Sequence, residues 1–298
     1  MTIAWVFPGQ GSQKIGMADS VIGLPGAKER FAFASELLGR DLLKVCGGQM
    51  EQQRPISDLN DTRNTQPAMF VVESLLIDDL RRQGREASLF AGHSLGEIVA
   101  LYAAEVIGME AALRLLKCRS ELMAGAADGA MTAVLGFDRT QLEELVQLND
   151  GVVIANDNSS SQVVLSGIPQ AVEKVTQELQ CKRAIPLQVS GAFHSPLMEE
   201  ASTAFVKELD QVSFSDAIVP VISNSDPQPT TNGLLLKERL KKQMTTGVRW
   251  RESMEVMIAE GVTTIVEIGP GNVLSGLAKR SLKGITTNQI ASSSDLGY

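Results

Sequence analysis

Short apolar runs alternate along the chain with segments in which apolar positions recur every three to four residues. Residues 3–7 form one continuous apolar run, and residues 87–91 form another that Ser88 alone interrupts. Residues 67–83 and 110–124 carry apolar side chains at helical spacing, and Pro67 suits the first turn of its helix. Because buried strands alternate with amphipathic helices, the pattern predicts an α/β fold built on a mainly parallel sheet.

The pattern becomes finer between residues 130 and 187, where six short elements follow one another. Their order is β-α-β-β-α-β, which is typical of a ferredoxin-like unit. We expect its strands at 131–135, 152–155, 162–166 and 183–187, and its helices at 140–148 and 170–179. The sequence therefore predicts a large domain of residues 1–127 and 194–298, with a small domain of residues 128–193 inserted into it.

The second part of the large domain begins with a helix-start signal. Ser195 occupies the cap position and Pro196 the first helical position, and Glu199 and Glu200 lie in the first turn. Further strands are expected at 219–223 and 263–268, and further helices at 234–244, 250–260 and 273–281. The residues from Thr286 onward are rich in Ser, Asn and Thr and are expected to be a loose tail.

Composition and charge narrow the class of protein. No apolar run approaches the roughly 20 residues that cross a bilayer, and the first residues carry no secretion signal, so we expect a cytoplasmic protein without a membrane partner. The net charge of -8 and the pI near 5.0 leave no broad basic field for nucleic acid. Three separated cysteines and two histidines favour neither a disulfide framework nor a metal site.

Ser94 is the first candidate for catalysis. It lies in the run Gly92-His93-Ser94-Leu95-Gly96, between a predicted strand and a predicted helix. Glycines at the first and last positions allow the sharp turn that exposes a nucleophilic serine, and the following helix directs its free N–H groups towards the reacting oxygen. The pattern by itself also fits an ordinary glycine-rich turn, so the prediction depends on this strand-to-helix context.

A serine nucleophile needs a general base, which is most often a histidine. Only His93 and His194 are present. His93 adjoins the serine, and neighbouring side chains on a tight elbow point apart. His194 lies where the chain leaves the inserted unit for a helix N-terminus, beside the cleft expected between two domains. By elimination His194 is the predicted base, and no acidic residue between Ser94 and His194 stands out as its partner.

Several motifs in a fixed order resemble those of one family, the malonyl-CoA:acyl carrier protein transacylases, whose relatives include the acyltransferase domains of polyketide and animal fatty acid synthases. The resemblance covers nearly the whole chain. Its landmarks are Phe7-Pro8-Gly9-Gln10-Gly11-Ser12-Gln13, Gly92-His93-Ser94-Leu95-Gly96-Glu97, Arg119 with Met123, Asn156 to Asn158 ahead of Gln162-Val163-Val164, Gly191-Ala192-Phe193-His194 and Glu267-Ile268-Gly269-Pro270-Gly271. The resemblance implies an α/β-hydrolase-like large domain with an inserted ferredoxin-like small domain.

The resemblance also implies roles for individual residues. Ser94 would attack the thioester of malonyl-CoA, and His194 would act first as general base and then as general acid. The main-chain N–H groups of Gln10 and Leu95 would bind the oxyanion. A main-chain carbonyl near Gln243 would orient His194, and because that partner is main chain, the identity of residue 243 is a weak test.

Two further residues would determine the choice of substrate. The guanidinium of Arg119 offers a planar fork that matches the free carboxylate of a malonyl group. Among relatives, a phenylalanine directly before the histidine accompanies malonyl and a serine accompanies methylmalonyl, so Phe193 points to the unbranched substrate. Taken alone, Arg119 would fit a solvated helix position beside the Leu116 and Met123 stripe better, and the resemblance reverses that preference.

The expected function is therefore a ping-pong transfer of a malonyl group from malonyl-CoA to the phosphopantetheine thiol of acyl carrier protein, by a monomer without a bound cofactor. A hydrolase using the same residues and an inactive carrier-binding module are the alternatives. Because carrier proteins of this kind are acidic, we expect a local basic patch beside the cleft. Its candidate residues are Lys182, Arg183, Lys237, Lys241, Lys242, Lys279 and Arg280.

Overall fold

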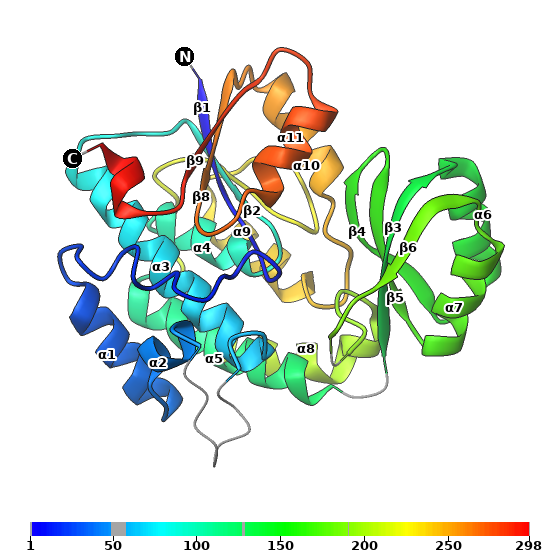
Figure 1. The fold of residues 1–298 in the computed structure, drawn as a ribbon, viewed down its shortest axis with the longest axis horizontal. Helices are drawn as coiled ribbons and strands as arrows, with labels where there is room; N and C mark the ends of the chain where they lie inside the picture. Colours follow the sequence, from blue (N-terminus) through cyan, green and yellow to red (C-terminus); the bar gives the residue numbers. More distant parts are fainter. Residues whose placement is uncertain (1, 49–57, 127–128, 190, 298) are drawn as a thin grey trace.

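Two separate β-sheets organise the computed structural model, which describes residues 2–48, 58–126, 129–189 and 191–297 (Figure 1). The larger sheet has five strands in the order β7-β2-β1-β8-β9, and every neighbouring pair is parallel. Its strands are β1 (Ile3–Phe7), β2 (Leu89–Gly92), β7 (Val221–Ile222), β8 (Thr264–Ile268) and β9 (Thr286–Ile290). The predicted α/β class with a mainly parallel sheet is confirmed.

Helices cover both faces of this sheet, which explains why strand β1 is apolar at every position. Trp5 and Phe7 face one side and pack with α3, α4 and α5, whereas Ala4 and Val6 face the other side and pack with α10 and α11. The helices of this part are α1 (Ala27–Leu38), α2 (Leu42–Cys46), α3 (Thr62–Arg82), α4 (Leu95–Ala103), α5 (Met109–Gly125), α8 (Glu199–Asp210), α9 (Gly233–Lys242), α10 (Trp250–Ala259) and α11 (Val273–Ser281). The short 3-10 turn η1 (Pro196–Met198) precedes α8, and Ser195 caps it.

The smaller sheet is antiparallel, with the strand order β4-β5-β3-β6. Its elements are β3 (Ala130–Phe137), α6 (Arg139–Leu148), β4 (Val152–Ser159), β5 (Gln162–Gly167), α7 (Pro169–Glu178) and β6 (Cys181–Pro186). Both helices pack on one face, around a core of their own. The ferredoxin-like arrangement is confirmed, whereas the predicted boundary between residues 127 and 128 lies outside the described residues.

The two sheets are joined beside the carboxyl end of strand β2. The N–H of Val248 donates to the carbonyl of Ala155 at 2.7 Å, and the N–H of Asp157 donates to the carbonyl of Val248 at 2.9 Å. The Asp157 carboxylate also pairs with Arg251 of α10 at 3.0 Å. These contacts fix strand β4 against the large sheet and form one wall of a cleft at the end of β2.

One helix start was predicted wrongly. Helix α3 begins at Thr62 with Asp61 as its cap, so Pro67 lies inside the helix rather than in its first turn. A proline there cannot donate to the carbonyl four residues earlier, which belongs to Arg63. The guanidinium of Arg40 donates to that carbonyl at 2.7 Å instead. A distant side chain therefore satisfies the acceptor that Pro67 leaves without its usual partner.

The prediction of a loose tail is also wrong. Residues Thr286–Ile290 form β9, which pairs in parallel with β8 along its whole length. The chain then ends in the 3-10 turn η2 (Ser293–Leu296), closed by a capping box between Ser292 and Asp295. Leu296 is buried in the main core. Edge pairing and this buried leucine order a segment whose polar composition suggested a loop.

No helix within the described ranges is both long and apolar enough to cross a bilayer.

Candidate active site

Ser94 occupies a strained turn between strand β2 and helix α4. Its backbone angles are φ 55° and ψ -108°, a conformation that few non-glycine residues adopt. A Cβ added at Gly92 would lie 1.8 Å from the carbonyl oxygen of Gly96, and one added at Gly96 would lie 2.1 Å from the carbonyl oxygen of Phe7. The two glycines are therefore required by backbone contacts, as the nucleophile elbow predicts.

Asn224, which follows strand β7, holds this turn from behind. Its Oδ1 accepts the N–H of Ser94 at 2.7 Å, and its Nδ2 donates to the carbonyl of Gly92 at 2.6 Å. The side chain is buried. It thus satisfies two main-chain groups that the strained turn leaves without regular partners. No motif in the sequence pointed to this residue, because its contacts depend on the position of β7 beside β2.

His194 faces Ser94 across the cleft. Its Nε2 lies 2.7 Å from Ser94 Oγ, and its Nδ1 lies 2.8 Å from the main-chain carbonyl of Gln243. A carbonyl can only accept, so Nδ1 carries the proton and Nε2 offers its lone pair to the serine hydroxyl. Burial, and secondarily the charge of Arg119, lower the pKa of His194 to about 3, which keeps the imidazole neutral.

Arg119 of helix α5 is fully buried and reaches the same point. Its Nη2 donates to Ser94 Oγ at 3.1 Å and to the side-chain oxygen of Gln243 at 2.9 Å, and its Nη1 donates to the side-chain oxygen of Gln66 at 2.8 Å. The solvated-face alternative for Arg119 is therefore wrong. Gln66 and its contact with Arg119 were missed by the sequence reasoning, because Gln66 belongs to no motif.

The Gln243 side chain also has a larger part in the site than the sequence reasoning gave it. Its Nε2 donates to the carbonyl of Ser94 at 2.9 Å and to the carboxylate of Glu97 at 2.7 Å. Its Oε1 accepts from Arg119, while its main-chain carbonyl faces His194. Gln243 therefore contacts Ser94, His194 and Arg119, and its side chain has contacts that a main-chain role alone would not require.

The predicted oxyanion residues also lie at the cleft. Gln10, in the loop after β1, and Leu95, at the start of α4, both line it with Ser94 and His194. Within the described chain, neither main-chain N–H donates to a protein acceptor, whereas the N–H of Ser94 is taken by Asn224. The N–H groups of Gln10 and Leu95 are thus the free donors beside Ser94.

The cleft itself is small and partly apolar. It has a volume of about 90 Å³ and receives Phe193, Met123 and, from the smaller-sheet side, Met131 and Leu187. Phe193, directly before His194, is buried. A cleft of this size and lining fits a short acyl group better than a long one.

His93 points away from the reaction. Its Nε2 lies 2.8 Å from the side-chain oxygen of Asn158 in strand β4, and its ring packs against Trp250. The expectation that neighbouring side chains on the elbow diverge is met. Among the described residues, no group of three or more His, Cys, Asp or Glu side chains is arranged to hold a metal ion.

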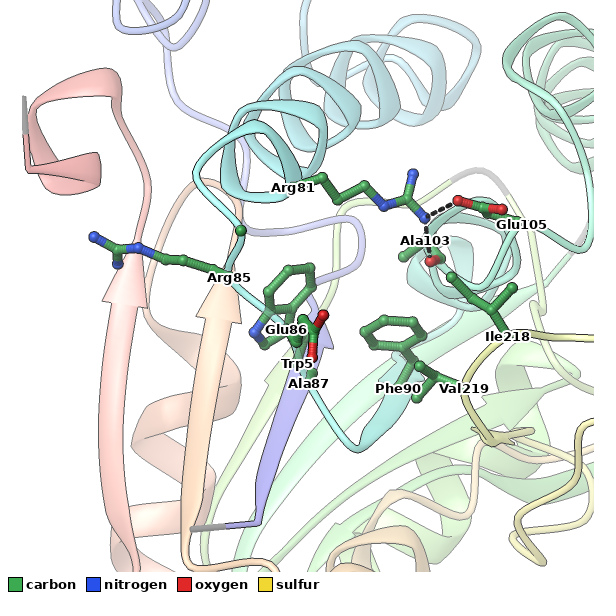
Figure 2. Close-up of a pocket in the computed structure, with 11 residues that line it drawn as sticks. Trp5, Arg81, Arg85, Glu86, Ala87, Phe90, Ala103, Glu105, Ile218 and Val219 are labelled. Carbon is green, nitrogen blue, oxygen red and sulfur yellow. Dashed lines mark hydrogen bonds and ion pairs between the residues drawn. The ribbon is translucent and has the colours of Figure 1, made fainter.

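A larger pocket of about 450 Å³ lies beside β1 and β2, where Arg85, Glu86 and Ala87 lead into β2 (Figure 2). Trp5 and Phe90 form its aromatic floor, with ring centroids 5.6 Å apart. The guanidinium of Arg81 is occupied by the carbonyl of Ala103 and the carboxylate of Glu105 (Figure 2). The lining of this larger pocket contains no serine, cysteine or histidine. The candidate active site is therefore the smaller cleft at Ser94.

Comparison with known proteins agrees with this geometry. The model of the acyl transferase domain family matches residues 4–295. A malonyl CoA-acyl carrier protein transacylase from Synechocystis sp. is 46% identical over 99% of both chains. The chain belongs to this acyltransferase family.

Solved structures of the family share the whole fold. The crystal structure of the Synechocystis malonyl-CoA:ACP transacylase superposes with a TM-score of 0.94 at 47% identity, covering 99% of both chains. A malonyl-transacylase in complex with a type II PKS acyl-carrier protein superposes with a TM-score of 0.90 at 35% identity, covering 99% of this chain and 98% of that one. The family fold, a large α/β part with a ferredoxin-like part, is the one described here.

Proposed function

We propose that this chain transfers a malonyl group from malonyl-CoA to the phosphopantetheine thiol of acyl carrier protein, for fatty acid synthesis. The 3.1 Å contact between Arg119 Nη2 and Ser94 Oγ carries the proposal. In a malonyl thioester the carboxylate carbon and the reacting carbonyl carbon are only about 2.5 Å apart, across one methylene. A cationic fork beside the nucleophile therefore suits a short acyl group that ends in a carboxylate.

In the first half-reaction, Ser94 Oγ attacks the thioester carbon and passes its proton to His194 Nε2. The N–H groups of Gln10 and Leu95 stabilise the negative charge on the carbonyl oxygen. The C–S bond then breaks, and His194 returns the proton to the departing CoA sulfur. The products are free CoA and a malonyl ester on Ser94.

The second half-reaction repeats these steps in reverse order, with the phosphopantetheine thiol in place of CoA. The phosphopantetheine thiol gives its proton to His194 as its sulfur attacks the ester carbon. The C–O bond to Ser94 breaks, and the serine oxygen recovers the proton from His194. Every proton moves through the one imidazole nitrogen that faces the serine, so the proposed reaction draws on no bound cofactor.

The substrate carboxylate also improves the base. The charge of Arg119 is one of the two main causes that lower the pKa of His194. When a malonyl carboxylate pairs with Arg119, that positive charge is neutralised and the pKa of His194 rises. Malonyl-CoA therefore strengthens the base that deprotonates Ser94, whereas acetyl-CoA does not.

We further propose that the acidic carrier docks on part of the expected basic set. Lys182, Arg183 and Lys242 are exposed, and Lys242 adjoins Gln243. Lys241 is already paired with Asp210 and Glu238. Raising the salt concentration should raise the KM for the carrier, and Lys182→Glu with Arg183→Glu should weaken that salt dependence. An unchanged KM across the salt series would remove the electrostatic docking proposal.

The last pair of the set serves as the comparison. Lys279 and Arg280 lie in the final turn of α11. This helix starts after the carboxyl end of β8, so its final turn lies away from the end of the sheet that holds Ser94. Figure 1 shows α11 near β8 and β9. Reversing both charges should alter the KM for the carrier less than reversing Lys182 and Arg183. A larger effect would place the docking surface on α11 instead.

The proposal also covers the domain organisation, the oligomeric state and the cellular location of the protein. Residues 1–127 and 194–298 form the large domain, and residues 128–193 form the small one, because each sheet has its own core. The enzyme works as a monomer, because one chain supplies the complete site, and sedimentation tests this. It works in the cytoplasm, which its three unpaired cysteines fit, and fractionation of cells tests that.

Acceptor dependence separates transfer from hydrolysis. Mixed with malonyl-CoA alone, a transferase releases a burst of about one CoA per enzyme and then stops, because the acyl-enzyme waits for its acceptor. Adding the carrier restarts CoA release. Continuous release without the carrier would identify a hydrolase, and no release in either case would fit a binding module.

A further inference from the structure

The guanidinium of Arg119 is held by two neutral amides. Gln66 Oε1 accepts from Nη1 at 2.8 Å, and Gln243 Oε1 accepts from Nη2 at 2.9 Å. Both glutamines are buried, with 1% and 0% of their surface exposed. Among the residues that the structure describes, no carboxylate forms an ion pair with Arg119, although buried arginines usually have one.

The orientation of each amide follows from its neighbours. Gln243 Nε2 faces two acceptors, the carbonyl of Ser94 and the carboxylate of Glu97, so its oxygen must face Arg119. Gln66 Nε2 faces the sulfur of Met123 at 3.4 Å. Its oxygen therefore also faces the guanidinium, which can only donate.

The carboxylate whose charge acts on Arg119 belongs to Glu97. Glu97 contacts Gln243 but forms no ion pair with Arg119, so its charge acts on the guanidinium only across the intervening amide. A direct carboxylate would occupy the planar fork and neutralise it. The amides fix the same donors without doing so. In addition, Arg119 Nε is buried with no hydrogen-bond partner among the described residues.

We propose that the side chains of Gln66 and Gln243 are positioning residues that set the preference for a substrate carboxylate. They hold Arg119 beside Ser94 and leave its charge to be neutralised by the substrate. This inference rests on the proposed malonyl transfer. It explains why amides, rather than carboxylates of the same shape, surround a buried arginine.

The decisive variant is Gln66→Glu, which keeps the size of the side chain and places a carboxylate against Arg119 Nη1. The measurement is kcat/KM for loading of Ser94 from malonyl-CoA and, separately, from acetyl-CoA. We expect kcat/KM for malonyl-CoA to fall by about 100-fold, mainly through a higher KM. The loss of a charged hydrogen bond between Arg119 and the substrate carboxylate corresponds to a change of about this size. Loading from acetyl-CoA should stay the same or rise, since acetyl-CoA has no carboxylate to bind and the added carboxylate also neutralises the charge that lowers the pKa of His194.

Gln66→Met tests the same contact without adding a charge. It leaves Nη1 of Arg119 without its acceptor, so the malonyl preference should fall by about tenfold. Gln211→Glu on the exposed end of α8 is the charge control and should leave both substrates unaffected. Thermal unfolding of each variant shows whether it is folded, and if Gln66→Glu fails to fold, Gln66→Met decides alone.

Two outcomes would overturn the inference. Equal losses with both acyl-CoA substrates would show that Gln66 supports the nucleophile or the fold rather than the clamp. An unchanged malonyl-to-acetyl ratio in both variants would show that the amides do not set selectivity. If the unmodified chain forms no malonyl-enzyme at all, the proposed function fails instead, and the wild-type reaction distinguishes that case.

Discussion

The imidazole Nδ1 of His194 lies 2.8 Å from the main-chain carbonyl of Gln243. The partner of His194 in the proposed catalytic group is thus a neutral carbonyl rather than a carboxylate. It fixes the tautomer of the base but adds no negative charge that would raise its pKa strongly. Burial and Arg119 therefore dominate, and they lower the pKa of His194 to about 3.

The first prediction concerns pH. Because the lowered pKa keeps His194 neutral, the free enzyme should retain a competent base well below the ordinary histidine pKa of about 6.5. The rate of Ser94 modification by a fluorophosphonate, an uncharged serine reagent, should stay flat from pH 8 to about pH 5. A half-maximal rate near pH 6.5 would show that the imidazole has an unperturbed pKa.

The same shift affects stability. Unfolding exposes His194 and restores its ordinary pKa, so between pH 6.5 and 3 the unfolded state binds more protons than the folded state. The stability contribution is present above pH 6.5 and is lost as the pH falls towards 3. Chemical denaturation at pH 7 and pH 5 should show a smaller pH-dependent loss for His194→Ala than for wild type. Equal losses in the two proteins would assign the acid sensitivity to other groups.

Arg119→Ala should distinguish substrates by charge. Without the guanidinium, loading from malonyl-CoA should fall by about 100-fold or more, because a buried charged hydrogen-bond donor is lost. Loading from acetyl-CoA should fall much less or rise, since the variant also removes a charge that lowers the pKa of His194. Parallel kinetics with both substrates test this, and equal losses would remove the carboxylate role of Arg119.

Asn224→Ala should reduce kcat while the protein stays folded. The change leaves the N–H of Ser94 and the carbonyl of Gly92 buried without partners, which costs about 1–3 kcal/mol each. The strained turn should relax and misplace Ser94 Oγ. Asn232→Ala is the control, because Asn232 only caps α9 at the surface. Comparable kcat in the two variants would contradict a role for Asn224 in holding the elbow.

Gly92→Ala should prevent the elbow from forming. The added Cβ would lie 1.8 Å from the carbonyl oxygen of Gly96, and neither backbone segment can move without displacing β2 or α4. Gly108→Ala adds the same atom where nothing lies within 4 Å, so it should be tolerated. Soluble yield and thermal unfolding of the two variants check this. Normal stability of Gly92→Ala would show that the backbone around Gly96 can move to accommodate the added Cβ.

The fold could be predicted where local signals agree with the tertiary contacts. Helix α11 at Val273–Ser281 matches its expected range, because an amphipathic pattern follows directly after a buried strand. Two predictions, the start of α3 and the loose C-terminal tail, failed for a common reason. Asp61 caps α3 locally, but the helix continues through Pro67 with the distant Arg40 satisfying the freed carbonyl of Arg63. The order of β9 depends on the open edge of β8, so both features depend on contacts that the neighbouring sequence does not show.

The candidate site divides in the same way. Ser94 and His194 could be selected from the sequence because an elbow motif and the scarcity of histidines pointed to them. Gln66 and Asn224 could not, because each is an isolated amide within or beside an apolar element. Their contacts arise only when α3 packs on α5 and when β7 pairs with β2.

The central claim is that Ser94 carries the malonyl group between the two thiols. The most direct measurement is mass spectrometry of the protein after mixing with malonyl-CoA, with peptide mapping of the modified residue and a chase with phosphopantetheine-bearing carrier protein. The account predicts one malonyl group on Ser94, its absence in Ser94→Ala, and its quantitative appearance on the carrier. Modification at another residue, or a malonyl-enzyme that water discharges as fast as the carrier does, would contradict it.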